Sequence, residues 1–385
     1  MEWIEKTLGE LGDIVGGATP STKHEEYYGG DIAWITPKDL SLFKGRYISC
    51  GERSITEAGL ASCSAQMMPS NTVLFTSRAP IGYVAIARQS VCTNQGFKSV
   101  VPHECVDSLF LYYLLKFNKE RIEAMGSGTT FKEVSGKTMK AVQVRIPCKI
   151  EDQKKIASIL DSIDSKIENN AKINDNLEQQ AQTLYKYYFP YSVGDELPDG
   201  WRIGSVGEII EIHDSKRIPL SGAERAKMEK KTYPYYGAAA LMDYVDDYIF
   251  DGKYLLLGED GTVVDDAGYP ILQYVWGQFW VNNHAHILTG KLGFNVESLY
   301  MLFKQTPVKA IVTGAVQPKI SQANLRSIQV VIPPPKLLTD YNSQIEPLFA
   351  LLRTNEEANK SLTALRDTLL PKLMSGEIDA SGIQL

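Results

Sequence analysis

The chain has 385 residues, 44% of them hydrophobic and 22% charged, which is typical of globular proteins and long enough for two or three domains. Its net charge of −6 argues against broad nonspecific binding of nucleic acid, although residues 1–150 hold 17 Lys and Arg against 15 Asp and Glu, a net charge of +2. No apolar run approaches the roughly 18 residues that cross a bilayer, the N-terminus is too acidic for a signal peptide, and the five cysteines are widely spaced, so we expect a cytoplasmic protein with free thiols.

Residues 1–150 predict the first domain. Short strand-like runs at residues 73–76 and 83–86 flank the turn Arg78-Ala79-Pro80-Ile81-Gly82, and residues 109–118 have a helical pattern. A β-branched run then ends at Pro147, which is typical of a last strand that leaves a domain. Short strands with a few helices favour an α+β fold.

Residues 151–190 predict a long helix followed by a linker. Its apolar positions alternate in steps of three and four for more than four heptads, which places them on one seam that can pair with another helix. Over residues 156–188 the helix would extend about 50 Å at about 1.5 Å per residue. This length exceeds one turn of B-DNA, about 34 Å.

Residues 191–335 predict a second domain that repeats the first. The segment Leu8-Gly9-Glu10-Leu11-Gly12-Asp13-Ile14 aligns with Ile203-Gly204-Ser205-Val206-Gly207-Glu208-Ile209 at an offset of 195. Residues 134–147 align with residues 320–333 at an offset of 186. Residues 254–257 predict a strand and residues 296–304 a helix, and three prolines at 333–335 end the domain. The chain is therefore expected to be a pseudo-twofold internal repeat.

Residues 336–385 predict a second long helix and a tail that leads back towards Trp3. Adding 185 to the seam positions of the first helix gives those of the second, with two asparagines in each seam. Buried asparagines lower stability but fix the register, so we expect the helices to pair as an antiparallel coiled coil, although the pattern alone does not fix that orientation. The alternative is that each helix packs only on its own domain. The expected pairing residues are Leu160, Ile163, Ile167, Asn170, Asn174, Leu177, Leu184, Ile345, Leu348, Leu352, Asn355, Asn359, Leu362, Leu369 and Leu373.

Patterns that suggest catalysis or a metal site are incomplete. The segment Ser135-Gly136-Lys137-Thr138 lacks the preceding glycine of a phosphate-binding loop, and no dinucleotide fingerprint or methyltransferase tetrapeptide occurs. His284 and His286 alternate on a strand without a clear third metal ligand. Acidic pairs at 246–247, 259–260 and 265–266 have no counterpart in the first half, so we interpret them as solvated loops or base-reading acids. We predict no catalytic residue and no metal site.

The repeated plan of a globular domain followed by a long heptad helix resembles the specificity subunits of type I restriction–modification systems. Local strings agree with that family: Gly17-Ala18-Thr19-Pro20-Ser21, Trp34-Ile35-Thr36-Pro37-Lys38-Asp39-Leu40, the Arg78 turn, Thr93-Asn94-Gln95-Gly96-Phe97 and Leu369-Leu370-Pro371-Lys372-Leu373-Met374-Ser375-Gly376-Glu377. The resemblance covers the whole chain. The second half departs from it with Asn282-Asn283-His284-Ala285-His286, as is expected if the two domains read different DNA.

The resemblance implies a non-catalytic subunit that recognises a bipartite target in double-stranded DNA. Each domain would read one half-site, while the helices set the gap and dock two modification subunits. S-adenosylmethionine, ATP and Mg²⁺ would be used by the modification and the restriction (motor–nuclease) subunits, and this chain would hold no cofactor.

Polar residues on turns are the candidates for base contacts, because Arg and Lys recognise guanine, Asn and Gln recognise adenine, and acids accept from cytosine. In the first domain we predict Lys23, Lys38, Ser77, Arg78, Asn94, Gln95, Lys98, Thr129, Thr130 and Lys132. In the second domain we predict Lys216, Arg217, Tyr235, Tyr236, Glu259, Asp260, Asn283, His284, Gln317 and Lys319. Trp34 and most tyrosines are expected in the core.

Two other functions stay open at the level of sequence. A nuclease or methyltransferase with an unrecognised site would act on DNA without partners. A scaffold for protein or glycan would show no sequence-selective DNA binding even with modification subunits added.

Overall fold

The computed structural model describes residues 1–128, 132–314 and 316–382. It divides into two compact units, of which unit 1 comprises Met1–Ala171 with Glu356–Leu385 and unit 2 comprises Lys172–Asn355. Two long helices, α7 (Ile150–Tyr188) and α12 (Pro335–Ser375), each contribute to both units. A unit therefore consists of one globular domain together with a stretch of each long helix. Within the described ranges, no helix has the length and apolar character needed to cross a membrane.

Unit 1 has three sheets. An outer pair joins β1 (Trp3–Thr7) to β10 (Gln143–Pro147) in antiparallel register. The five-stranded sheet has the order β2 (Gly12–Gly16), β9 (Lys98–Pro102), β6 (Val73–Ser77), β7 (Ile81–Ala87), β4 (Tyr47–Ile48). The three-stranded sheet has the order β5 (Ser54–Ile55), β3 (Tyr28–Ile35), β8 (Cys92–Thr93). The short helices are α1 (Leu8–Leu11), η1 (Glu25–Tyr27), α2 (Pro37–Leu42), α3 (Glu57–Ala61), α4 (Ser108–Phe117), α5 (Lys119–Ala124), α6 (Gly136–Ala141) and η4 (Ala380–Gly382).

Unit 2 follows the same plan. Its outer pair is β11 (Arg202–Ser205) with β20 (Gln329–Ile332). One four-stranded sheet has the order β12 (Ile210–Ile212), β19 (Ala285–Gly290), β16 (Tyr254–Gly258), β17 (Leu272–Val275), and the other β14 (Leu241–Val245), β13 (Tyr233–Tyr236), β18 (Gln278–Val281), β15 (Phe250–Asp251). The short helices are α8 (Val206–Ile209), η2 (Asp214–Lys216), α9 (Gly222–Ala226), α10 (Val296–Phe303), η3 (Lys309–Ile311) and α11 (Gln322–Ser327).

The repeat is present, but the offset of 195 expected at its start is wrong by three residues. Thr7 and Glu10 form a capping box at α1, and Ser205 and Glu208 form the same box at α8, so equivalent residues there differ by 198. Gly9 accordingly corresponds to Gly207. Each glycine faces the helix before the last strand, where a Cβ would lie 3.2 Å from the Lys140 carbonyl or 3.0 Å from the Arg326 Cβ. Sequence similarity aligned Gly9 with Gly204, because each segment has two glycines three residues apart.

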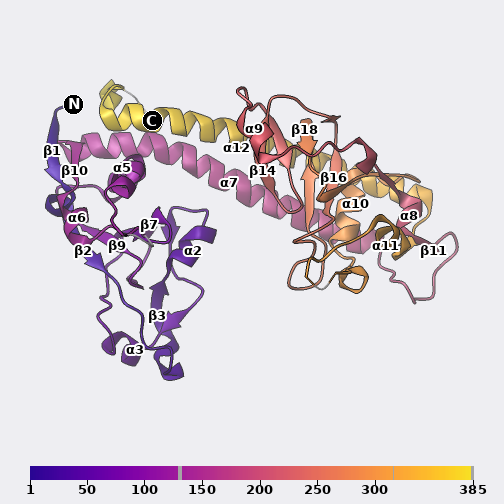
Figure 1. Ribbon diagram of the computed structural model, residues 1–385, viewed down its shortest axis with the longest axis horizontal. Helices are drawn as coiled ribbons and strands as arrows, with labels where there is room; N and C mark the ends of the chain where they lie inside the picture. Colours follow the sequence, from indigo (N-terminus) through magenta and orange to yellow (C-terminus); the bar gives the residue numbers. More distant parts are fainter. Residues whose placement is uncertain (129–131, 315, 383–385) are drawn as a thin grey trace. The chain divides into compact units, whose positions relative to one another are not determined.

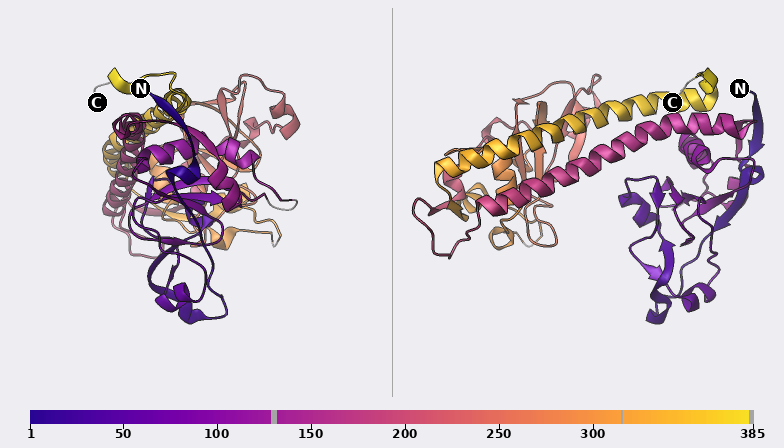
Figure 2. Two further views of the ribbon diagram at one scale, coloured as in Figure 1. Left: turned by 90° about the vertical axis from the view of Figure 1, so that its left-hand side faces the viewer. Right: turned by 180° about the vertical axis from the view of Figure 1, so that it is seen from behind.

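The expected coiled coil is present in both units, and its orientation is antiparallel. In unit 1, Asn170 Nδ2 donates to Asn359 Oδ1 over 2.9 Å, and in unit 2 Asn355 Nδ2 donates to Asn174 Oδ1 over 2.9 Å. Within each unit the two helices lie side by side (Figures 1 and 2). Every predicted pairing residue is buried or half-buried. The seam asparagines therefore satisfy one another across the helix pair, which explains why they occur at matching positions.

The helices also pack on the domains, but each helix contributes to both cores, so the alternative that each packs only on its own domain is wrong. Ile156 and Leu160 of α7 and Leu373 of α12 belong to the core of unit 1, while Tyr341 and Ile345 of α12 belong to the core of unit 2. Polar contacts add to this packing. Arg46 is buried, and its guanidinium bonds Asp161 Oδ1 at 2.7 Å on α7; in unit 2, Lys253 Nζ lies 3.0 Å from the Glu346 carboxylate on α12. Each domain and its helix stretch thus share one core.

The N-terminus and the C-terminal tail meet in unit 1, as the tail pattern predicts. The Met1 amino group lies 3.7 Å from Asp379 Oδ2, and Trp3 and Ile378 pack against the same core. Unit 1 is therefore built from both ends of the chain.

Replacing one seam asparagine is expected to destabilise the helix pair. In Asn170→Leu, Asn359 Oδ1 loses its donor in the seam, so the free energy of unfolding should fall by about 1–3 kcal/mol. In the double variant Asn170→Leu/Asn359→Leu an apolar contact replaces the amide pair, and most of the loss should be recovered. Urea unfolding followed by circular dichroism measures both, and equal losses in the single and double variants would contradict the pairing.

Candidate nucleic-acid interface

Three loops of unit 1 meet at one end of its strands. They follow β3, β6 and β8, and they place Lys38, Arg78 and Asn94 around one cavity of about 440 Å³. The strands β3 and β8 are parallel neighbours, which brings the ends of both to the same edge. Thr36, Pro37, Ala79 and Gly96 complete the lining. Three predicted site residues are thus brought together from segments far apart in the sequence.

Backbone hydrogen bonds hold these loops in place. The Asn94 N–H donates to the Ile35 carbonyl over 3.1 Å, and Asn94 Oδ1 accepts from the Gly96 N–H over 2.8 Å. The Ser77 N–H donates to the Gly96 carbonyl over 2.7 Å. The Asn94 side chain therefore shapes its own loop, while the bonds to Ile35 and from Ser77 fix that loop against neighbouring segments.

The charged side chains of the unit 1 loops are paired near the surface. Glu133 lies 3.6 Å from Arg78 and 3.3 Å from Lys98, and Lys38 lies 2.7 Å from Glu52. The Arg78 side chain is 35% exposed. Of these pairs, Lys38–Glu52 and Arg78–Glu133 are the more exposed, and such pairs contribute little to stability, so a ligand can displace their carboxylates at small cost.

Unit 2 reproduces the same frame with other side chains. The Asn282 N–H donates to the Tyr236 carbonyl over 3.0 Å, Asn282 Oδ1 accepts from the His284 N–H over 2.8 Å, and the Glu259 N–H donates to the His284 carbonyl over 2.8 Å. These bonds match those of Asn94, Gly96 and Ser77 one for one. Consequently Asp260 stands at the position of Arg78, and His284 at the position of Gly96. Sequence reasoning selected Asn283 and missed Asn282, the true equivalent of Asn94.

The polarity of the loop ion pairs is reversed between the units. Val134 and Ile320 are equivalent, because their N–H groups donate to the carbonyls of Ser77 and Glu259 over 3.0 and 2.8 Å. Lys319, the residue before Ile320, therefore corresponds to Glu133, and it lies 3.2 Å from Glu259. Asp260 forms a hydrogen bond with His284. Unit 1 thus carries cations on the loop where unit 2 carries anions.

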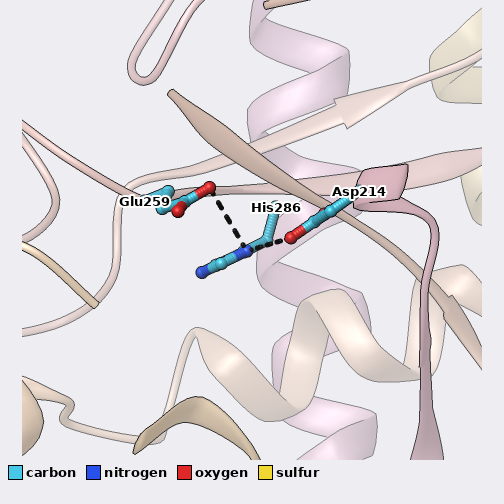
Figure 3. A group of neighbouring side chains, drawn as sticks. All are labelled: Asp214, Glu259 and His286. Carbon is cyan, nitrogen blue, oxygen red and sulfur yellow. Dashed lines mark hydrogen bonds and ion pairs between the residues drawn. The ribbon is translucent and has the colours of Figure 1, made fainter. Parts of the chain in front are cut away.

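A buried charged group lies beneath the loops of unit 2 (Figure 3). The ligand atoms of Asp214, Glu259 and His286 lie within 4.8 Å of one another, so His286, rather than His284, has the two further partners that the sequence did not reveal. His286 Nδ1 lies 2.6 Å from Asp214 Oδ2, and Nε2 lies 2.8 Å from the Ile320 carbonyl. Both ring nitrogens therefore lie within hydrogen-bonding distance of an oxygen atom.

Arg217 supplies the remaining positive charge of this group. Its guanidinium lies 2.6 Å from Glu259 and 3.4 Å from Asp214. Burial raises the pKa of Asp214, but the hydrogen bond and charge of His286, the Ile287 N–H and Arg217 together hold it below its usual value. Because both ring nitrogens of His286 are already hydrogen-bonded and Arg217 lies against both carboxylates, the group fits a structural ion network better than a metal site. Glu259 is therefore paired within the domain, not a freely solvated loop residue.

Two predicted contact residues are corrected by their burial. Ser77 is fully buried and its hydroxyl bonds the Gly96 carbonyl, while Tyr235 is 1% exposed and its hydroxyl accepts from the Leu220 N–H over 3.0 Å. Both support the loops from within. Thr129 and Thr130 lie outside the described residues.

The remaining predicted residues lie near the surface. Tyr236 is half-buried against Phe279, and Gln95 accepts a hydrogen bond from the Thr19 hydroxyl. The others are exposed, namely Lys23, Lys132, Lys216, Asn283 and Gln317.

The chain matches known families and structures over nearly its whole length. The family model described as the type I restriction modification DNA specificity domain matches twice, over residues 1–179 and 198–363. The chain is 34% identical to the type I restriction enzyme MjaIX specificity subunit of Methanocaldococcus jannaschii, over 98% of this chain and 94% of that protein. It is 24% identical to the EcoprrI specificity subunit of Escherichia coli, over 86% of this chain and 84% of that protein.

A solved structure shares the fold. The S subunit of a type I restriction–modification system from M. genitalium aligns with a TM-score of 0.61 and 19% identity, covering 97% of this chain and 96% of that one. With the two matches of the family model and the 34% identical relative, this resemblance leads to one conclusion: the chain belongs to the family of type I restriction–modification specificity subunits.

Proposed function

We propose that this chain is the DNA-recognition subunit of a type I restriction–modification complex, in which each domain reads one half of a bipartite target. The observation that carries the proposal is the duplicated loop frame, because Asn94 and Asn282 hold the same backbone geometry while the side chains at the tips differ. Two domains whose loops share one backbone conformation but carry different polar side chains are suited to recognise two different short DNA sequences.

Catalysis is proposed to reside in other subunits, since the specificity subunit family is non-catalytic. Two modification subunits would dock on the helix pair and use S-adenosylmethionine, and restriction subunits would use ATP and Mg²⁺. These partners would also add positive charge around DNA, which a chain of net charge −6 needs for tight binding. The complex would work in the cytoplasm.

The proposed base contacts follow the chemistry of the loops. In the first domain Arg78 and Lys38 would donate to guanine O6 and N7, and Asn94 and Gln95 would contact adjacent bases. In the second domain Asp260 would accept from the amino group of cytosine or adenine, with His284 and Asn283 beside it. These base-contacting groups would be positioned by four residues, Lys98, Arg217, Glu259 and Lys319. The sugar-phosphate backbone of the DNA would be contacted by Lys23, Lys132, Lys216 and Gln317.

The experiment that tests the proposal compares methylation in cells with and without this gene. We expect methylated bipartite sites, two short sequences separated by a gap of fixed length, only when this chain and its modification subunits are present. Methylation or cleavage by the purified chain alone would favour an enzyme. Failure of the complex to select any DNA sequence would favour a scaffold.

Replacing Arg78 by Ala is expected to weaken recognition of one half-site only. A bidentate contact between arginine and guanine contributes about 1–3 kcal/mol, so specificity at that base should relax by about five- to 150-fold. Competition binding with targets altered in one half-site or the other measures the effect, and the second half-site is the internal control. Equal losses for both half-sites would reject the assignment.

A further inference from the structure

A second cleft of unit 1, of about 290 Å³, brings three lysines together from separate segments. Lys44 follows α2, Lys116 lies in the last turn of α4, and Lys119 begins α5. The turn that carries Arg78 ends at Gly82, which also lines this cleft. The lysines are spread over 75 positions of sequence, so no local pattern predicted them.

Two of the lysine side chains, those of Lys116 and Lys119, are held by close packing, whereas Lys44 is exposed. Lys116 Nζ lies 3.3 Å from the Tyr112 hydroxyl and over the Tyr112 ring. The stem of Lys119 lies against Gly82, where a Cβ would be 2.5 Å from Lys119 Cγ. Gly82 also has a φ of +96°, a conformation that favours glycine. This glycine therefore allows the turn and Lys119 to approach each other.

The charge of the cleft is not neutralised. Among residues 1–128, 132–314 and 316–382, no carboxylate forms an ion pair with Lys44, Lys116 or Lys119. The acids that influence Lys116 from a distance are Asp164 and Asp367; Arg366 lies 2.8 Å from each. Burial lowers the pKa of Lys116, because desolvation penalises its charged form. A bound anion would relieve this penalty.

Unit 2 provides a contrast at the equivalent position. Lys116 follows the N-cap Asp107 of α4 by nine residues, as Lys304 follows the N-cap Asn295 of α10. Lys304 Nζ lies 2.6 Å from Glu178 Oε1. The same helix position is thus neutralised within unit 2 and left open to an external anion in unit 1.

We propose that the Lys44–Lys116–Lys119 cleft binds a phosphodiester group of the DNA backbone and so positions the first domain on its half-site. This inference rests on the proposed function. Two features favour DNA over a small anion, because the same two segments line this cleft and the loop cavity. Lys38 lies in α2 and Lys44 follows its end by two residues, and the turn from Arg78 ends at Gly82. A contact to phosphate positions the protein without reading sequence.

The test measures the salt dependence of DNA binding by the complex of this chain with its modification subunits. Each phosphate contact contributes about 0.9 to the slope of log K against log salt concentration, so the double variant Lys44→Gln/Lys119→Gln should bind with a slope smaller by about one to two. When salt rises from 50 to 200 mM, the affinity of both complexes for DNA should fall. For each phosphate contact that the variant lacks, the fall should be about three- to fourfold larger in the wild-type complex. Base preference should stay unchanged. Lys304→Gln is the matched control, because that lysine is already paired, and it should leave the slope unchanged.

A methylphosphonate scan distinguishes the possible anions. Replacing one backbone phosphate beside the first half-site by an uncharged methylphosphonate should weaken the wild-type complex and leave the double variant unaffected. An unchanged salt slope in a variant that still folds, judged by circular dichroism, would overturn the inference. A thermal shift with inorganic phosphate that the variant loses, without any change in DNA binding, would also overturn it in favour of a free anion. If the wild-type complex selects no bipartite site, the proposed function fails instead.

Discussion

A heptad inserted into both long helices is expected to lengthen the gap between the half-sites without changing the bases that are read. The insertions belong between Asn170 and Asn174 in α7 and between Asn355 and Asn359 in α12, so that each existing asparagine pair keeps its partner. Seven residues add about 10 Å at 1.5 Å per residue, and one base pair occupies about 3.4 Å, so the gap should grow by up to about three base pairs. Seven residues also preserve the phase of the seam.

Methylome mapping of cells that carry the altered subunit measures the new gap directly. A heptad inserted into α7 alone is the control, because it shifts one seam against the other and should abolish site-selective methylation. If the matched insertion changed the bases that are read instead of the gap, the helices would not set the distance between the half-sites. If the gap stayed the same, partner subunits rather than this helix pair would set it.

The helix pair was largely predictable from the sequence, because its signal is periodic and uninterrupted. The long helices begin at Ile150 and Pro335, one residue from the predicted starts, and the asparagines meet as expected. The helices α4 and α10 and the strands β6, β7 and β16 also lie where local patterns placed them. The start of the repeat was misaligned because glycines recur there three residues apart, whereas the equivalent capping boxes and the pairing of β1 with β10 and of β11 with β20 reveal the register.

The site was only partly predictable, because its contacts are long-range. The turns that carry Arg78 and Asn94 were predictable, since Gly and Pro mark them, and both residues line one cavity; their contact with DNA stays a prediction. The burial of Ser77 and Tyr235, in contrast, depends on strands far away in sequence. The ion network of Asp214, Arg217 and His286 joins residues up to 72 positions apart, and the lysine cleft joins three elements. Residue type predicts what a side chain can do, but only the tertiary fold decides whether it faces solvent.

Replacing Arg366 by Ala is expected to destabilise unit 1 by about 3 kcal/mol. Arg366 occupies a seam position of α12 and lies 2.8 Å from Asp164 Oδ1 on α7, and the Asp164 carboxylate is 7% exposed. The Tyr113 hydroxyl donates to the same carboxylate over 2.8 Å. Removing the guanidinium leaves a buried carboxylate with one neutral donor, and losses of about 3–5 kcal/mol accompany such a change. We take the lower figure because Arg366 itself is partly exposed.

A double variant separates the loss of charge pairing from the loss of packing. In Asp164→Asn/Arg366→Gln both charges are absent, the Tyr113 hydroxyl keeps an acceptor, and the side chains stay similar in size, so at least half of the stability should return. The midpoint of urea unfolding, followed by the fluorescence of Trp3 and Trp34 in unit 1, measures both variants. If Arg366→Ala and the double variant lost the same free energy, packing of the arginine stem rather than the buried ion pair would hold the two helices together at this position.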